Sequence, residues 1–147
     1  MEIFLTVISG TLIFVIGQIL LKFFIEPIYL RKLIVGEIAD CLIFYGKFYC
    51  NDLKNDSPLD KNQRNDGSLK LKSLSTQLIA KTNAIPFCLE LFDLSGTKDA
   101  ARELIAISNR MLVSNDADIA HGVNLIKMNY EGADKIFNLL RIKFKPD

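Results

Sequence analysis

The sequence contains little of the chemistry from which catalytic and metal sites are usually built. It has one histidine, His121, and three cysteines, Cys41, Cys50 and Cys88, with no C-x-x-C spacing. A structural zinc site needs about four such ligands close together, and an odd cysteine count does not fit the disulfide framework of a small secreted domain. We therefore expect reduced and mostly buried thiols, no bound metal and no cofactor.

Motifs for phosphate groups and nucleic acids are missing too. Neither G-x-x-x-x-G-K-S/T nor G-x-G-x-x-G occurs, so nucleotide binding is not supported. The formal net charge is only +1, without a long basic run, so we expect no nucleic-acid partner. Asp118 and Ser114 lie near His121, but nothing marks the oxyanion site that a hydrolase needs, and a surface or capping histidine is the simpler interpretation. We predict that the protein is not an enzyme.

The sequence does have a long uncharged apolar run close to its N-terminus. No charged residue occurs from Ile3 to Leu21, a stretch of 19 positions. A helix rises about 1.5 Å per residue, so this run matches the ~30 Å hydrocarbon core of a bilayer. Met1 and Glu2 supply no basic region of a signal peptide, and no A-x-A-like site follows the run. We predict a retained transmembrane anchor over residues 1–26, in contact with membrane lipid.

The charges beside the anchor predict its orientation. Lys22, Arg31 and Lys32 follow the apolar run, whereas Glu2 is the only charged side chain before it. Positively charged residues stay on the cytoplasmic side of a membrane. We therefore expect a single-pass protein of the cell inner membrane, with its N-terminus outside and its C-terminal domain in the cytoplasm, where free thiols are stable.

Small and amide residues within the apolar run suggest that the anchor self-associates. Thr6, Gly10 and Gly17 share one side of a helix, and small residues let helix backbones approach closely. Gln18, on the adjacent strip, would gain from hydrogen bonding to a partner helix. The alternative is that Gln18 lies at the cytoplasmic interface and is simply hydrated. The hypothesis is a homo-oligomer held together by these four residues.

After the anchor, the pattern predicts a juxtamembrane amphipathic helix over residues 27–50. Pro27 either starts a new helix, the natural alternative because proline suits the first turn, or kinks a continuous one. Apolar side chains then recur at helical spacing; they are Ile34, Ile38, Cys41, Tyr45 and Phe48. Charged residues fall mostly elsewhere, and the hypothesis is that they form an inter-subunit charge network under the membrane, the alternative being a solvated polar face. These residues are Glu26, Arg31, Lys32, Glu37 and Asp40.

Residues 51–68 are predicted to form a polar loop, with at most a short helical turn after Ser57 and Pro58. Helix is expected again from Leu69, and a further helix is expected to start at Thr97 as its N-cap. Near the C-terminus, apolar residues alternate at spacings of four and three, as in a coiled coil, in one helix or in two broken near Asn129. They are Ile119, Val123, Ile126, Tyr130, Ala133, Phe137 and Leu140. The fold class is therefore all-α: one transmembrane helix followed by a small cytoplasmic helical bundle, with residues 69–147 packing against 27–50.

Short motifs add a resemblance to these expectations. Residues 17–28 read GQILLKFFIEPI and residues 36–39 read GEIA, with IPF at 85–87 and Ser108-Asn109 further on. The chain resembles a group of small, uncharacterised bacterial membrane proteins that have a single span, this junction and a short helical domain. The resemblance implies an inner-membrane protein and brings no activity or functional residue with it.

Two functions from different classes fit these features. The leading hypothesis is a membrane-anchored, self-associating helical module for interaction or sensing, without catalytic activity. The alternative is a membrane-disrupting effector of the host-defence type, whose cytoplasmic domain senses a small signal and reorganises the spans. Only the architecture of a short anchor with a small non-catalytic domain motivates the second hypothesis.

Overall fold

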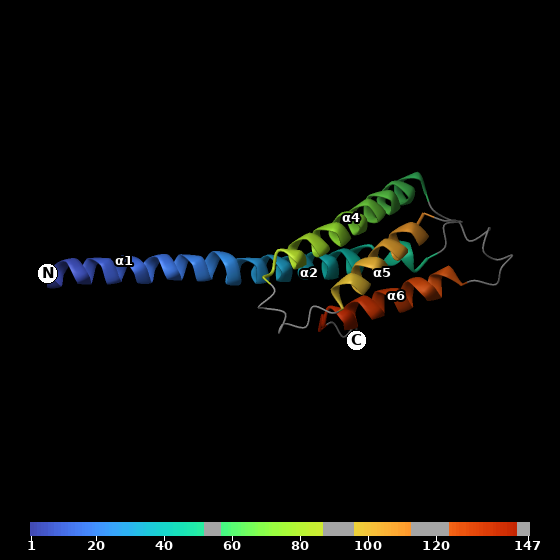
Figure 1. Ribbon diagram of the computed structural model, residues 1–147. Coiled ribbons are helices and arrows are strands. Elements are labelled where there is room, and N and C mark those ends of the chain that lie inside the picture. Colours follow the sequence, from blue (N-terminus) through green and yellow to red (C-terminus); the bar gives the residue numbers. More distant parts are fainter. Residues whose placement is uncertain (52–56, 87–95, 113–123, 144–147) are drawn as a thin grey trace.

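The computed structural model describes residues 1–51, 57–86, 96–112 and 124–143, and every regular element in these ranges is helical. One long helix projects from a bundle, as Figure 1 shows. The elements are α1 (Glu2–Leu20), η1 (Leu21–Ile25), α2 (Glu26–Phe44), α3 (Gly46–Tyr49), α4 (Pro58–Asn83), α5 (Thr97–Arg110) and α6 (Leu125–Leu139). The predicted all-α class, with one long apolar N-terminal helix followed by further helices, is confirmed.

The first three elements form one uninterrupted helix from Glu2 to Phe44. No residue of α1 is buried, and most of the side chains that it exposes are apolar. By length and composition this helix can cross a membrane, and it is the one such helix in the described ranges. An exposed surface of this kind is stable in lipid and costly in water, because about 25 cal/mol is lost for each Å² of apolar surface left hydrated.

The helix continues through Pro27 because the turn before it is wide. Proline has no N–H, and in an α-helix its ring clashes with the carbonyl four residues earlier. Here that turn is the π-helix η1, in which the Glu26 N–H bonds to the Leu21 carbonyl five residues back. The wider spacing accommodates Pro27 at the start of α2 without a break. Of the two alternatives for Pro27, the structure therefore has the continuous helix.

The remaining helices run up and down beside α2. At the end far from α1, Lys47 pairs with Asp60 at the start of α4 (3.4 Å). At the end near α1, Arg31 donates to the Thr97 hydroxyl at the start of α5 (3.1 Å). Helices α2 and α5 thus lead away from α1, and α4 and α6 return toward it (Figure 1).

The apolar face predicted for residues 27–50 points into the bundle, but it comes from two helices, α2 and the short α3, which meet at Tyr45. Ile34, Ile38 and Cys41 are buried, as is Phe48 in α3, and Tyr45 is half-buried. They join one hydrophobic core with side chains from α4, α5 and α6. Its fully buried members include Leu42, Leu71, Leu78, Leu104, Ile107 and Ile136.

The prediction of a polar loop over residues 51–68 is wrong for its second half, because α4 begins at Pro58. A capping box starts this helix: the Ser57 hydroxyl accepts from the Asp60 N–H (3.2 Å), and the Asp60 carboxylate accepts from the Ser57 N–H (3.1 Å). The first turns looked like a loop because their buried positions hold Arg64, Gly67 and Ser68 instead of apolar residues. The helix expected from Leu69 is present as the continuation of α4, with Leu71, Leu74 and Leu78 buried.

Small and hydroxyl side chains bring α4 and α5 into close contact. The Ser68 hydroxyl donates to the Ser108 carbonyl (3.1 Å), and the Ser108 hydroxyl donates to the Ser68 carbonyl (2.9 Å). One turn beyond Leu71, the Ser75 hydroxyl donates to the Ala101 carbonyl (2.9 Å). Each buried hydroxyl thus has a backbone acceptor across the interface, which removes the cost of burying it.

Two predictions for the later helices are corrected. Gly96 is the N-cap of α5, and Thr97 lies inside the helix, buried, where it accepts from Arg31. Helix α6 runs through Asn129 without a break. Of the predicted seam, Ala133 and Leu140 are buried and Phe137 packs against the core, but Tyr130 is exposed, and Asn129, Gly132 and Ile136 are buried in addition. Asn129 is buried, whereas Tyr130 is 65% exposed, because Asn129 has hydrogen-bond partners inside the bundle. Ile119 and Val123 of the seam fall outside the described residues.

Candidate functional site: the outward face of the long helix

The structure divides the predicted charge network under the membrane. Arg31 points into the bundle, where it donates to Thr97. Lys32, Glu37 and Asp40 instead remain exposed on the outward face of α2. Glu26 is exposed as well, at the start of the same helix. The five residues therefore do not form one group, because the helical phase turns Arg31 toward the core while Lys32 faces away from it.

The outward face of α2 carries a shallow groove with apolar walls and charged edges. Its lining residues are Tyr29, Lys32, Leu33, Gly36, Glu37 and Asp40. Tyr29 is 59% exposed and Leu33 is 46% exposed, so two large apolar side chains meet solvent beside the α-carbon of Gly36. A Cβ atom built on Gly36 would meet nothing within 4 Å. No described part of the bundle packs over this groove, which leaves a helix backbone accessible between two apolar side chains.

The four residues predicted to hold two copies of the anchor together all lie on α1, and none of them is buried. A Cβ on Gly10 or Gly17 would meet nothing within 4 Å, and Gln18 is exposed. The Thr6 hydroxyl donates to the Glu2 carbonyl of its own helix (3.0 Å). Thr6 can therefore sit in lipid or in a helix interface without an unsatisfied hydroxyl. Their role in self-association stays a prediction.

A second groove, of about 310 Å³, separates α6 from the junction of α2 and α3. Its lining residues include Leu42, Tyr49, Cys50, Tyr130, Phe137 and Asn138. Burial raises the pKa of the Tyr49 phenol and of the Cys50 thiol, so both groups are neutral at physiological pH. The Tyr49 hydroxyl already donates to the Leu42 carbonyl (2.9 Å). The groove therefore offers an apolar surface with little free polar chemistry.

A chain of polar contacts behind this groove links three helices. Lys135 approaches Glu103 at 2.7 Å, and Glu103 lies 3.9 Å from Arg110. Arg110 Nε donates to the side-chain oxygen Oδ1 of Asn129 (2.7 Å), and the side-chain Nδ2 of Asn129 donates to the backbone carbonyl of Tyr49 (2.9 Å). The sequence pattern did not single out Arg110, and it marked Asn129 only as a possible break between two helices. The contacts tie α5 and α6 to α3 and position no reactive group.

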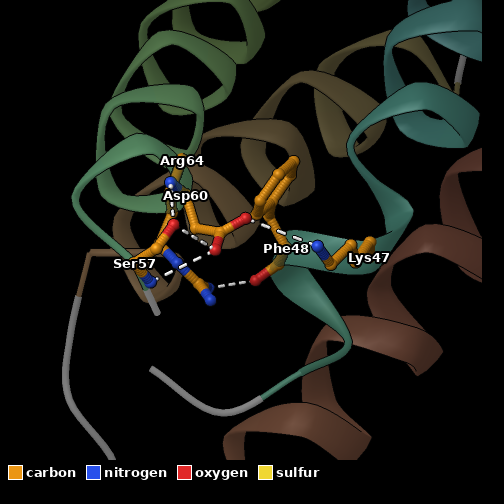
Figure 2. Close-up of polar contacts among 5 residues, drawn as sticks. All are labelled: Lys47, Phe48, Ser57, Asp60 and Arg64. Atoms are coloured by element: carbon orange, nitrogen blue, oxygen red, sulfur yellow. Dashed lines mark hydrogen bonds and ion pairs between the residues drawn. The ribbon is translucent and has the colours of Figure 1, made fainter. Parts of the chain in front are cut away.

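A further polar junction closes the far end of the bundle (Figure 2). Arg64, only 3% exposed, donates to the backbone carbonyl of Phe48, and its guanidinium lies 5.9 Å from the centre of the Phe48 ring. Lys47 reaches Asp60 beside it. Asp60 has its pKa lowered, first by hydrogen bonds from the Ser57 hydroxyl and N–H and then by Lys47. These contacts anchor the start of α4 against α3.

Comparison with protein-family models, with curated proteins and with solved structures finds no match for this chain. The resemblance to small single-span membrane proteins therefore remains a prediction. His121, Asp118, Ser114 and Cys88 lie outside the described residues. Among the features that the structure does describe, the outward face of α2 is the strongest candidate for function, because it is the exposed continuation of a helix that can cross a membrane.

Proposed function

We propose that the protein is a membrane-anchored helical module that self-associates and presents its bundle for interaction or sensing at the inner face of the cell inner membrane. The observation that carries this proposal is the uninterrupted helix from Glu2 to Phe44, whose first half is mostly apolar and uncharged after Glu2 up to Leu21 and whose second half has an exposed groove. A continuous helix couples events in the span to the bundle, since neither part can turn without the other.

The charges near the end of the apolar run support the inner-face location. Lys22 lies in η1, and Lys32 lies exposed in α2, ten residues further along the same long helix. Both come after the span, and only Glu2 precedes it. Positively charged flanks favour retention on the cytoplasmic side. The bundle is thus proposed to lie in the cytoplasm, with its far end, at α3 and the start of α4, pointing away from the membrane.

Glycines on the exposed anchor support self-association. Gly10 and Gly17 leave the backbone of α1 open, and lipid chains fill such a notch less closely than another helix does. Gln18 adds an amide that can bond across a helix pair, worth about 0.6–2 kcal/mol in a membrane. No reactive group is required for this role, so the proposed protein acts through its assembly and not through catalysis.

The proposal is tested by measuring association of the full-length protein in liposomes of bacterial lipid. Energy transfer between donor-labelled and acceptor-labelled copies should rise as the protein-to-lipid ratio increases. Gly17→Leu should weaken the association by filling the notch, and Val15→Leu, on the opposite side of α1, is the matched control. A strictly monomeric protein at every ratio, or digestion of the bundle by protease added outside intact cells, would overturn the proposal.

A further inference from the structure

The exposed face of α2 has the spacing of a two-stranded coiled coil. Tyr29, Leu33, Gly36 and Asp40 follow one another at intervals of four, three and four residues, which places them at the central d, a, d and a positions of a heptad. Lys32 directly precedes an a position and Glu37 directly follows a d position, so they occupy the flanking g and e positions. The groove on this face therefore has the composition of a hole that receives a side chain from a parallel helix.

The π turn brings this face into line with the small residues of the span. Gly17 and Gly36 are 19 residues apart, one more than the ~18 residues that make five turns of an α-helix. In an unbroken α-helix the extra residue would rotate Gly36 by roughly 100° away from Gly17. The wide turn η1 takes up one residue in its i to i+5 hydrogen bonds. Gly10, Gly17 and Gly36 consequently lie along one side of the long helix.

We propose that this side of the helix pairs with the same side of a second copy of the chain, in parallel and in register, from Thr6 to Glu37. The inference rests on the proposed function and specifies its partner and geometry. Parallel orientation follows because two copies with the same flanking charges insert in the same direction. A two-fold axis along the pair then brings each glycine opposite its own copy, where the backbones approach closely.

Charge complementarity selects this pairing among the ways in which two such helices can meet. In a parallel pair, a g residue lies beside the e residue five positions later on the other helix. Lys32 and Glu37 are five residues apart and opposite in charge, so the symmetric pair contains two Lys32–Glu37 contacts between copies. Both side chains are exposed in the single chain, and the same pairs would not form between antiparallel helices in this register.

Acidic residues set the limits of close contact between the two copies within α2. Asp40 occupies the next a position, where it would face the Asp40 of the second copy. Glu26 occupies the preceding a position at the membrane end. Like charges at facing central positions repel, so close contact in α2 is confined to the stretch from Tyr29 to Glu37. Replacing Asp40 by Asn should therefore tighten the pair.

The test is a charge exchange in the full-length protein, measured by energy transfer in liposomes at low ionic strength. Lys32→Glu should raise the dissociation constant of the pair by about tenfold, because two attractive contacts become repulsive. The double variant Lys32→Glu with Glu37→Lys should return it to within about twofold of the original protein. Lys61→Glu, an exposed lysine on α4, is the control for net charge. A double variant that associates as weakly as Lys32→Glu alone would overturn the inference.

Disulfide cross-linking tests whether the pairing faces of α1 and α2 lie on the same side of the long helix. Thr6→Cys and Leu33→Cys should each cross-link two copies, whereas Val15→Cys and Leu69→Cys, on other surfaces, should not. Cross-linking through only one of the first two positions would refute the alignment across η1. Association that persists without response to the charge exchange overturns this inference and leaves the proposed function standing, while a monomer in every assay overturns both.

Discussion

Gly67 lies directly beneath the ring of Tyr45, where α4 crosses the end of α2. A Cβ atom at this position would come within 2.6 Å of Cδ1 and 2.8 Å of Cγ of that ring. The ring cannot easily move away, since Tyr45 also contacts Phe44 in a T-shaped arrangement (4.9 Å between centroids) and lies near the Phe48 ring (6.2 Å). The close approach of α2 and α4 thus depends on the absence of a side chain at Gly67.

We predict that Gly67→Ala destabilises the bundle despite the better helix propensity of alanine. Overpacking costs about 1–3 kcal/mol, and the gain in propensity offsets roughly 1 kcal/mol of it. Because a Cβ atom here would lie within 3.0 Å of three Tyr45 ring atoms, we take the upper part of that range, and the net loss is then up to about 2 kcal/mol. It should lower the melting temperature by roughly 5 °C, measured by far-UV circular dichroism in detergent. Asp66→Ala, at the exposed neighbouring position, should leave the melting temperature within about 2 °C of the original.

The same substitution in a Tyr45→Ala background isolates the cause. Without the ring, Gly67→Ala should stabilise the bundle by about 1 kcal/mol, because only the propensity term remains. The two substitutions are therefore predicted to be strongly non-additive. An equal effect of Gly67→Ala with and without Tyr45 would refute the reasoning from the close contact.

Three further predictions follow from the polar contacts. Ser57→Ala should cost about 1 kcal/mol by removing the cap of α4. The lowered pKa of Asp60 stabilises the fold at pH values above the ordinary pKa, and this contribution is lost as the pH falls through the lowered pKa. The variant should therefore lose stability less steeply in acid titrations followed by circular dichroism. Asn129→Leu should cost about 1–3 kcal/mol in denaturant unfolding because it leaves two buried partners unmatched, whereas Asn138→Leu, exposed on the same helix, should change little. Cys50 should react with iodoacetamide more slowly in the folded protein than in denaturant, by mass spectrometry, because burial raises its pKa; equal rates would contradict this.

Elements whose signal is local were predictable from the sequence. The apolar run predicts α1, because bilayer-length hydrophobicity needs no knowledge of neighbouring helices. Ile34, Ile38 and Cys41 predict the buried face of α2, because a single apolar stripe at helical spacing has one way to be buried. The outward position of Lys32 follows from the same phase once the buried face is known.

Elements whose buried positions are polar or small were not predictable. Arg64 and Ser68 are buried in α4 only because Phe48 offers a carbonyl and Ser108 offers a matching hydroxyl. The same sequence without those partners reads as a surface loop. Asn129 was likewise read as a possible break, since its partners on α3 and α5 are remote in the chain. Arg31 appeared to belong with its neighbour Lys32 until the position of Thr97 was known.

The sequence by itself determined that one N-terminal helix is apolar enough for a membrane and that an amphipathic helix follows it, because hydrophobicity and period are properties of a single segment. The tertiary structure alone decided which polar residues are buried and which side of the long helix remains open. The wide turn before Pro27 fixes how the sides of α1 are rotated relative to those of α2. The core formed with α4 and α5 covers the side of α2 opposite the open one. Burial of a polar group depends on partners far along the chain, so no local pattern records it.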